Sequence, residues 1–550
     1  MKVNRTELAF VTVLLLFAAA LRLIGVENGM PDPAAFPTET AHGLIPYSVP
    51  IQPDEFLFVA RPYHMIVSRQ LNPGYFENPS FLINLNFFTF LLSGEGKGVT
   101  VAEWKGIDER EQAPFRFYVI GRTYSALIGL LAVAAIYGLG RRVAGRRAAL
   151  FAGLLVAVAE PLVQHAHYTT STSIAGGFTA VALWAALVTL YRPRWWLFWI
   201  AGIAAGLAAG SRYNAAAISI IVFLVGLILL YRHHLLWTRV LIGWLLVPVT
   251  FTLTTPHVIF DPVTVIHDFR YITAQYVSGE GLEFTTIYGL FFEYRYLILF
   301  GIGIPAALAV LVGLYAAWRS RGRDLLRDNS PLLVVLLVAA FVIPYSLVVL
   351  RTARPGHSDQ LLVPVIAAFA LAAGIGAAWI AGRRRWLVPV VALILIVFPL
   401  TLSVQLVRQF TRTDTRYLMQ QWVYEHLPRG SHIQLNGSYN VPLDESLYPW
   451  TQNFTDDNVS LDQMRAEGVD YVILSDALIH DDDRSHEIIP ADYLRQMHEY
   501  LAIFEALPLV AHIDRARLLG DDWMTYTASV WHNPGLSVYC LTPESCAAVH

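Results

Sequence analysis

The sequence predicts a polytopic α-helical membrane protein with about eleven transmembrane helices and an extracytoplasmic α/β domain at the C-terminus. Three observations lead to this fold class. Hydrophobic residues make up 55% of the 550-residue chain and charged residues only 15%, whereas soluble proteins carry about a quarter charged residues. Long apolar stretches recur through residues 1–410. Residues 411–550 have the composition of a soluble domain.

Eleven stretches approach the roughly 20 apolar residues that a membrane span requires. The two clearest, Pro331–Leu350 and Trp386–Leu406, contain no charged residue. The other nine are Leu8–Val26, Tyr118–Gly140, Ala148–Leu162, Ile174–Tyr191, Trp195–Ala209, Ala215–Tyr231, Val240–Thr255, Tyr288–Trp318 and Leu361–Ala381. The shortest two are rich in Ala and Gly, which suits close helix packing in lipid.

Basic residues predict the orientation of these spans. They gather in every second loop: at Lys2 and Arg5, Arg141–Arg147, Arg192 and Arg194, Arg232 and Arg239, Arg319–Arg327, and Arg383–Arg385. Because basic loops stay on the cytoplasmic side, this alternation predicts a cytoplasmic N-terminus. An odd number of spans then places the C-terminal domain outside the cell membrane.

The first outer loop, Glu27–Arg116, is long and contains two apolar stretches that are too short or too polar to span. These stretches, Phe56–Leu71 and Pro79–Leu92, are predicted to be helices that lie in the membrane interface. The other predicted outer elements are residues 165–173, 211–214, 257–286 and 351–360.

Alternating helices and strands predict the α/β domain. The expected helices are Thr413–Leu427, Leu461–Glu467 and Ala491–Phe504, and the expected strands are Ser431–Leu435, Val469–Leu474, Leu509–Ile513 and Leu536–Cys540. Cys540 and Cys546 are the only cysteines and lie in this domain, so we expect them to form a disulfide. No Cys/His spacing resembles a zinc site.

The acidic pair Asp54-Glu55 precedes the first interfacial helix and is the leading candidate for catalysis. A carboxylate at the outer membrane surface can accept a proton from a hydroxyl nucleophile. The alternative is a solvated acid that begins a helix, because Pro53-Asp54-Glu55 before an apolar run is a good helix start. Both readings stay open at this point.

Three further segments carry candidate binding residues. In the turn before the second interfacial helix, Glu77 is a candidate ligand for a divalent cation and Asn78 a candidate donor to phosphate; the alternative is a plain turn. Arg212 follows a Gly-rich span, and an arginine near membrane depth suits a lipid phosphate, unless it extends to the interface. The hydroxyl-rich turn His165–Thr170 suits a sugar pocket, whereas its two histidines are poorly spaced for a metal.

These features together resemble the GT-C membrane glycosyltransferases. The shared features are a first span, an outer Asp-Glu pair, a Pro turn with an apolar helix, and the segments GLLAVAAIYGLGRRVAGRRAALFAGLLVAVAEPLVQHAHY and GLAAGSRYNA. The branches most similar are the dolichyl-phosphate-mannose protein mannosyltransferases and the bacterial lipid A aminoarabinose transferases. The resemblance covers residues 5–410, most specifically 50–260.

The resemblance implies roles for individual residues. Asp54 would be the catalytic base, with Glu55 beside it, and Glu77 would ligate a divalent metal cation. Arg212 would lie near the lipid phosphate, and the donor-binding residues would be Arg212, Tyr213, Asn78, His167 and Tyr168. Many relatives have a basic residue and two prolines where this chain has Asn78-Pro79-Ser80, and an Asp where it has Thr172 or Ser173.

The predicted function is therefore that of an inverting glycosyltransferase with an Asp base. It would move a sugar from a polyprenyl-phosphate-linked donor to a protein or glycan acceptor outside the membrane, without nucleic acid as a partner. Topology favours a lipid-linked donor independently, because nucleotide sugars are not supplied outside. The alternatives are a transporter or flippase of lipid-linked sugars and a non-catalytic cell-envelope assembly subunit. The sugar and the acceptor stay open.

Overall fold

The computed structural model describes residues 5–27, 54–93, 115–278, 287–322, 324–350, 358–437, 440–444, 446–453, 460–476 and 533–549, with short pieces between 495 and 514. The chain forms two compact units. The first includes the N-terminal helix and residues 54–407, and the second includes residues 408–550.

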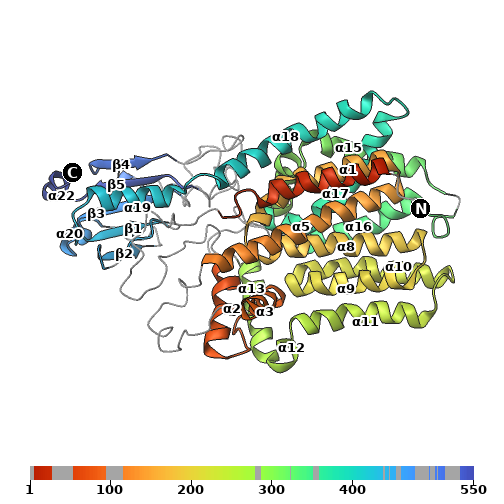
Figure 1. Ribbon diagram of the computed structural model, residues 1–550, viewed down its shortest axis with the longest axis horizontal. Helices are drawn as coiled ribbons and strands as arrows, with labels where there is room; N and C mark the ends of the chain where they lie inside the picture. The colour runs from red at the N-terminus through yellow and green to blue at the C-terminus, as the bar shows by residue number, and fades with distance from the viewer. Residues whose placement is uncertain are drawn as a thin grey trace. The chain divides into compact units, whose positions relative to one another are not determined.

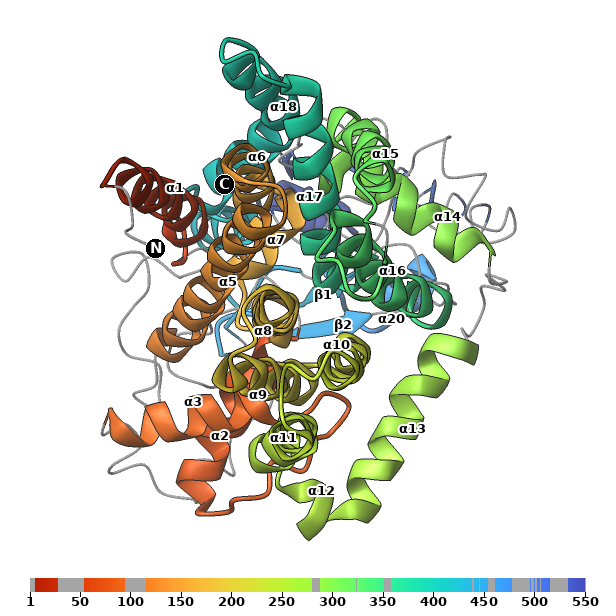
Figure 2. The ribbon, with the colours of Figure 1, turned by 90° about the vertical axis from the view of Figure 1, so that its right-hand side faces the viewer.

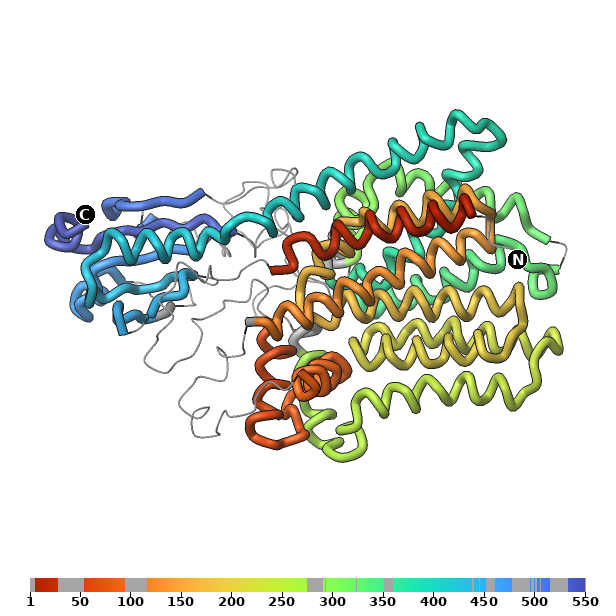
Figure 3. The backbone as a smooth tube through the Cα atoms, viewed as in Figure 1, coloured from red at the N-terminus to blue at the C-terminus, as the bar shows by residue number. Residues whose placement is uncertain are grey.

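Eight helices among the described residues are long and apolar enough to cross a membrane, and all belong mainly to the first unit. They run alongside one another (Figures 1 and 3). Seven are α1 (Arg5–Leu23), α5 (Phe115–Val143), α8 (Ser171–Tyr191), α11 (Trp237–Thr254), α16 (Pro331–Val348), α17 (Ser358–Ala381) and α18 (Leu387–Phe410). The eighth joins the short helix η2 (Tyr213–Ile218) to α10 (Ser219–Tyr231). These helices confirm a polytopic helical membrane protein.

Two more predicted spans are broken helices. In the first, α6 (Arg146–Val158) bends by 58° into α7 (Glu160–Gln164) and η1 (His165–His167). Pro161 has no N–H to donate to the carbonyl of Ala157, four residues earlier. Arg22 of α1 donates to that carbonyl instead at 2.9 Å, and to Val156 at 2.9 Å. The buried Arg22 therefore completes the hydrogen bonding of the break, where the negative end of the α6 dipole favours a cation.

The second broken span runs through α14 (Ile287–Tyr296) and η3 (Leu297–Gly301), then bends by 107° into α15 (Ile304–Arg319). Gly303 has φ +82°, a conformation that favours glycine, and Pro305 follows in the first turn of α15. The hydroxyl of Tyr296 donates to Glu160 Oε2 at 3.0 Å, so the two broken spans are joined near their breaks. Both had been expected as single spans from hydropathy alone.

The eleventh predicted span is α9 (Trp195–Ser211), a 17-residue apolar helix. It packs against α8 and α11 in the bundle (Figure 2). A Cβ at Gly202 would lie 2.2 Å from the carbonyl oxygen of Gly243, so the α9–α11 crossing requires glycine at this point. With the bent pairs counted once each, the described residues hold up to ten spans by length, and α9 would be the eleventh.

The two helices expected in the first outer loop are present as α2 (Glu55–Ser68) and α3 (Phe81–Leu92). They run crosswise to the spans at one end of the bundle (Figures 1 and 2). The rings of Phe90 on α3 and Phe117 on α5 stack at 3.9 Å and fix this end of the bundle. The short helix α12 (His257–Phe260) and α13 (Pro262–Ser278) follow α11. The location of α2 and α3 at the bilayer surface stays a prediction.

The second unit is a small domain with a five-stranded mixed sheet, which confirms the predicted α/β class. The strands are β1 (Ile433–Asn436), β2 (Trp450–Asn453), β3 (Tyr471–Ser475), β4 (Leu509–Ile513) and β5 (Leu536–Cys540), in the order β2-β1-β3-β5-β4. β1 pairs in parallel with β2 and β3, whereas β5 is antiparallel to β3 and β4. The described helices are α19 (Thr415–His426), α20 (Leu461–Ala466) and α22 (Pro543–Ala547).

In this unit one local prediction is confirmed and one strand was missed. Cys540 and Cys546 form the expected disulfide, with their Cα atoms 5.2 Å apart. Strand β2 was not predicted, because Trp450-Thr451-Gln452-Asn453 lacks the apolar alternation of a strand. The predicted helix Ala491–Phe504 lies mostly outside the described residues.

Candidate active site

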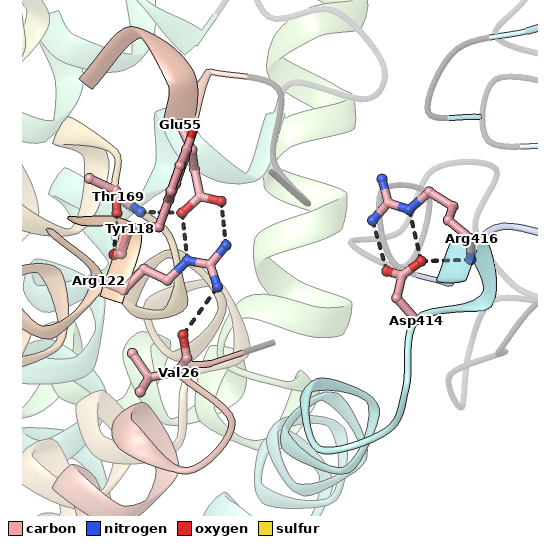
Figure 4. Close-up of polar contacts among 7 residues, drawn as sticks. All are labelled: Val26, Glu55, Tyr118, Arg122, Thr169, Asp414 and Arg416. Atoms are coloured by element: carbon pink, nitrogen blue, oxygen red, sulfur yellow. Dashed lines mark hydrogen bonds and ion pairs between the residues drawn. The ribbon is translucent and has the colours of Figure 1, made fainter. Parts of the chain in front are cut away.

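The two acids of the Asp54-Glu55 pair occupy different environments. Asp54 is half-buried at the N-cap of α2, but its side chain does not cap the helix. Glu55, the first residue of α2, is completely buried. Its Oε1 accepts hydrogen bonds from Arg122 Nε at 2.8 Å and from the backbone N–H of Thr169 at 2.7 Å, and its Oε2 accepts from Arg122 Nη2 at 2.7 Å (Figure 4). Only Asp54 therefore offers a partly exposed carboxylate.

Arg122 lies on α5 and was not among the residues expected at the site. It is 2% exposed, and its Nη1 also donates to the carbonyl of Val26 at 3.1 Å. A signal was present in the sequence, because Arg122 is the one charged residue within the otherwise apolar stretch 118–140. A charge within a span marks a functional or structural site by default.

Arg212 ends α9 and is half-buried. Its Nη1 donates to the hydroxyl of Thr172 at 2.5 Å and to Gln360 Oε1 at 3.0 Å. Both partners are neutral, and the described residues show no ion pair to this guanidinium. A guanidinium whose printed partners are neutral keeps its net positive charge and can attract an anion.

The turn between α2 and α3 is held by residues from distant elements. The hydroxyl of Tyr213 donates to the carbonyl of Phe76 at 2.9 Å, and Asp268 on α13 accepts from the Phe76 N–H at 2.8 Å. Asn78 Nδ2 donates to the hydroxyl of Tyr75 at 3.1 Å. These contacts bring Tyr213 and Asn78 to the same turn as Glu77, and they add Asp268, which the sequence did not single out.

Glu77 is half-buried in this turn. Burial, together with the negative charges of Asp268 and Asp54, holds the pKa of its carboxyl above the usual range, while Arg61 acts in the opposite direction. The charges of two other acids thus act on the Glu77 carboxyl in this turn. Even so, no group of three or more His, Cys, Asp or Glu side chains within the described part of the chain is arranged to hold a metal ion. The divalent cation expected at Glu77 stays a prediction.

His167 and Tyr168 lie inside the fold. The ring nitrogens of His167 are 2.8 Å from the carbonyl oxygen of Val163 and 2.9 Å from that of Ile24. Tyr168 is 1% exposed, and its ring lies 5.9 Å from that of His165. These contacts hold the turn before α8 in place, so a direct contact of either side chain with a donor stays a prediction.

The comparisons with known proteins agree with this architecture. Residues 119–260 match the family model described as dolichyl-phosphate-mannose-protein mannosyltransferase. No curated protein matches the chain in sequence. Among solved structures, the apo oligosaccharyltransferase of Archaeoglobus fulgidus is 13% identical with a TM-score of 0.50, and the match covers 90% of this chain and 72% of that one.

Two further solved structures have lower TM-scores. ArnT from Cupriavidus metallidurans bound to undecaprenyl phosphate is 17% identical with a TM-score of 0.48, over 98% of this chain and 99% of that one. The Archaeoglobus fulgidus oligosaccharyltransferase in complex with Zn and sulfate is 14% identical with a TM-score of 0.46, over 89% and 70%. Residues 119–260 therefore match that family model, and the chain shares its fold with the Archaeoglobus fulgidus oligosaccharyltransferase.

Proposed function

We propose that the chain transfers a sugar from a polyprenyl-phosphate-linked donor to a hydroxyl of a protein or glycan acceptor, with inversion at the anomeric carbon. Asp54 is the general base, and Arg212 binds the phosphate of the donor. The donor class is supported by the family match, whose description names a dolichyl-phosphate sugar. The reaction takes place on the extracytoplasmic side.

The chemistry assigns one task to each of the two residues. The acceptor hydroxyl gives its proton to the Asp54 carboxylate while its oxygen forms a bond to the anomeric carbon. The bond between that carbon and the phosphate oxygen breaks, and the polyprenyl phosphate leaves with the electron pair. Attack from the face opposite the phosphate inverts the anomeric centre.

The observation that carries this proposal is the neutral environment of the Arg212 guanidinium. A polyprenyl-phosphate sugar is a phosphodiester with one negative charge, and the departing phosphate monoester has two. A cation without a compensating carboxylate binds the second charge more strongly than the first, so it stabilises the transition state more than the bound donor. The hydrogen bond from Arg212 to Thr172 holds the guanidinium at the start of α8.

One feature of the fold is also found in secondary transporters. The two broken spans carry Glu160, 3% exposed, and Glu293, completely buried. Discontinuous helices with buried ionisable groups often form transport sites. An enzyme would form a glycosylated product, whereas a transporter would move the lipid-linked sugar without forming one.

The decisive experiment uses the purified full chain in liposomes with a radiolabelled polyprenyl-phosphate sugar and candidate acceptors. The proposal predicts a glycosylated acceptor with inverted anomeric configuration, determined by NMR, and free polyprenyl phosphate in equal amount. Movement of the labelled lipid between leaflets without any glycosylated product would contradict the proposal and favour the transporter. A product with retained configuration would contradict the single displacement on Asp54.

A further inference from the structure

The ion pair between Glu55 and Arg122 connects three parts of the site that are distant in sequence. Glu55 begins α2 directly after Asp54, Arg122 lies on α5, and Thr169 precedes α8. We propose that this pair is a positioning clamp, which fixes the Asp54 base relative to the Arg212 that binds phosphate. The inference rests on the proposed function, because it assigns Glu55, Arg122 and Thr169 a role in the reaction of Asp54 and Arg212.

The geometry gives Glu55 no direct part in the chemistry. It has no exposed surface, so an acceptor hydroxyl cannot reach its oxygens. Its two oxygens accept three hydrogen bonds, two from Arg122 and one from the Thr169 N–H. These hydrogen bonds hold the Glu55 side chain and the start of α2 in a single orientation. The neighbouring residue, Asp54, is therefore held on a fixed backbone.

The same contacts reach Arg212 through the turn before α8. The N–H of Thr169 bonds to Glu55, and its hydroxyl donates to the carbonyl of Tyr118 at 2.9 Å. Three residues later, Thr172 accepts the hydrogen bond from Arg212. The Glu55 carboxylate thus fixes the backbone that carries Asp54. It also fixes the segment that contacts Arg212.

The clamp depends on the shape of the guanidinium and not only on its charge. Arg122 contacts both oxygens of Glu55 through Nε and Nη2, and its Nη1 reaches Val26. A lysine would keep the positive charge but supplies a single ammonium that cannot reproduce this fork. Arg122→Lys should therefore loosen Asp54 while Glu55 keeps a positively charged partner. Complete loss of that partner would leave a buried unpaired charge, which is strongly destabilising.

The second unit offers a matched control. Arg416 and Asp414 form a bidentate pair of the same type, with Nε to Oδ1 at 2.8 Å and Nη2 to Oδ2 at 2.7 Å (Figure 4). Both side chains of that pair are 1% exposed. Arg416→Lys makes the same chemical change in a buried pair of the other unit.

The test compares the two lysine variants in the full chain for kcat, donor KM and thermal stability in detergent. We expect Arg122→Lys to lower kcat by about 10- to 100-fold, because small displacements of catalytic groups have effects of this order. Donor KM should change by less than about twofold, and Tm should fall as in Arg416→Lys. An unchanged kcat in Arg122→Lys, or a loss equal to that of Arg416→Lys, would overturn the clamp.

A double variant tests the clamp if Arg122→Lys does not fold. Glu55→Met with Arg122→Met removes both charges together, which buried pairs often tolerate well. The clamp predicts a folded protein with low kcat; wild-type kcat would overturn it. Asp54→Asn, measured in parallel, separates the two hypotheses. If Asp54→Asn is fully active, the proposed base is wrong whatever the clamp variants show.

Discussion

The hydroxyl of Tyr213 donates a hydrogen bond to the carbonyl oxygen of Phe76 at 2.9 Å. This bond ties the residue after Arg212 to the residue before Glu77. Because the Tyr213 proton is already donated to the backbone, we predict that Tyr213 acts by fixing the turn. The site is thus assembled by contacts between segments more than a hundred residues apart.

Tyr213→Phe should lower kcat/KM by about fivefold, because a typical hydrogen bond contributes about 1 kcal/mol and the ring is retained. Steady-state rates with varied donor will measure the change. Tyr294→Phe is a suitable control, since its hydroxyl contacts Ser346 at 2.7 Å, away from the turn. A loss above about 100-fold in Tyr213→Phe would instead indicate a direct contact with the phosphate.

Arg212→Ala should lower kcat/KM by about 10²- to 10³-fold and also raise donor KM, because it removes the cation that faces the phosphate. Thr172→Val removes a neutral partner and keeps that cation, so its effect should be less than about tenfold. Initial rates and binding of unlabelled polyprenyl phosphate will separate the two effects. Equal losses in both variants would show that orientation of Arg212, and not its charge, limits the reaction.

Glu77 provides a prediction on stability against pH. Since burial and the nearby acids raise the pKa of Glu77 above its ordinary value of 4.5, the folded state binds this proton more tightly than the unfolded state. The resulting stability is complete below the unfolded pKa and is lost as the pH rises through the folded pKa. At neutral pH, Glu77→Gln should therefore have a higher Tm than the wild type.

The difference in Tm between Glu77→Gln and the wild type should shrink as the pH falls below the ordinary glutamate value, where both side chains are neutral. Asp268→Asn should reduce the difference at neutral pH, because the charge of Asp268 contributes to the shift. Thermal unfolding in detergent at several pH values will show this. A wild type that is more stable than Glu77→Gln at neutral pH would contradict the prediction and indicate a cation bound to Glu77.

Hydropathy and composition predicted the fold well because each span and strand carries its own local signal. Strands β4 and β5 have the bounds expected from the sequence, Leu509–Ile513 and Leu536–Cys540. The break at Gly301–Gly303 was not predicted, and the partner that completes the break at Ala159, Arg22, lies far away in the chain. The sequence indicates the length of a span. It does not indicate where a distant side chain takes over the backbone hydrogen bonds of the helix.

The prediction of the candidate site from sequence was limited in the same way. The sequence identified Asp54 and Glu55 together, but only the structure separates a half-buried acid from a buried one. The partner that makes the difference, Arg122, is 67 residues from Glu55. Asp268 is 192 residues from Phe76 and has no local motif that marks it. A pattern read along the chain cannot rank residues whose roles are set by such distant contacts.

The alternation of arginine clusters predicts that the loop after α15 lies in the cytoplasm and that the C-terminal domain lies outside. Single cysteines at exposed positions, Ser320→Cys after α15 and Ala466→Cys in α20, should react with a membrane-impermeant thiol reagent from opposite sides. Cys540 and Cys546 give no background because they are joined in a disulfide. Labelling of both new cysteines from outside would contradict the cytoplasmic N-terminus and the odd number of spans.

The last prediction concerns the base itself. Asp54→Asn keeps the shape of the side chain but cannot accept a proton, so kcat should fall by about 10²- to 10⁴-fold while donor KM stays nearly constant. Single-turnover transfer from a radiolabelled polyprenyl-phosphate sugar will measure the chemical step directly. Binding of polyprenyl phosphate to the variant will check that the donor site is intact.

Two rival acids lie at the turn between α2 and α3 and serve as matched controls. Glu77→Gln and Asp268→Asn make the same change from carboxylate to amide, and both residues influence the same turn. If Asp54 is the base, each should lower kcat by less than about tenfold. An active Asp54→Asn with an inactive Glu77→Gln would move the base to Glu77, whose pKa lies above the usual range. Such an outcome would also fit the half-buried position of Glu77, because the acceptor must approach whichever acid takes its proton.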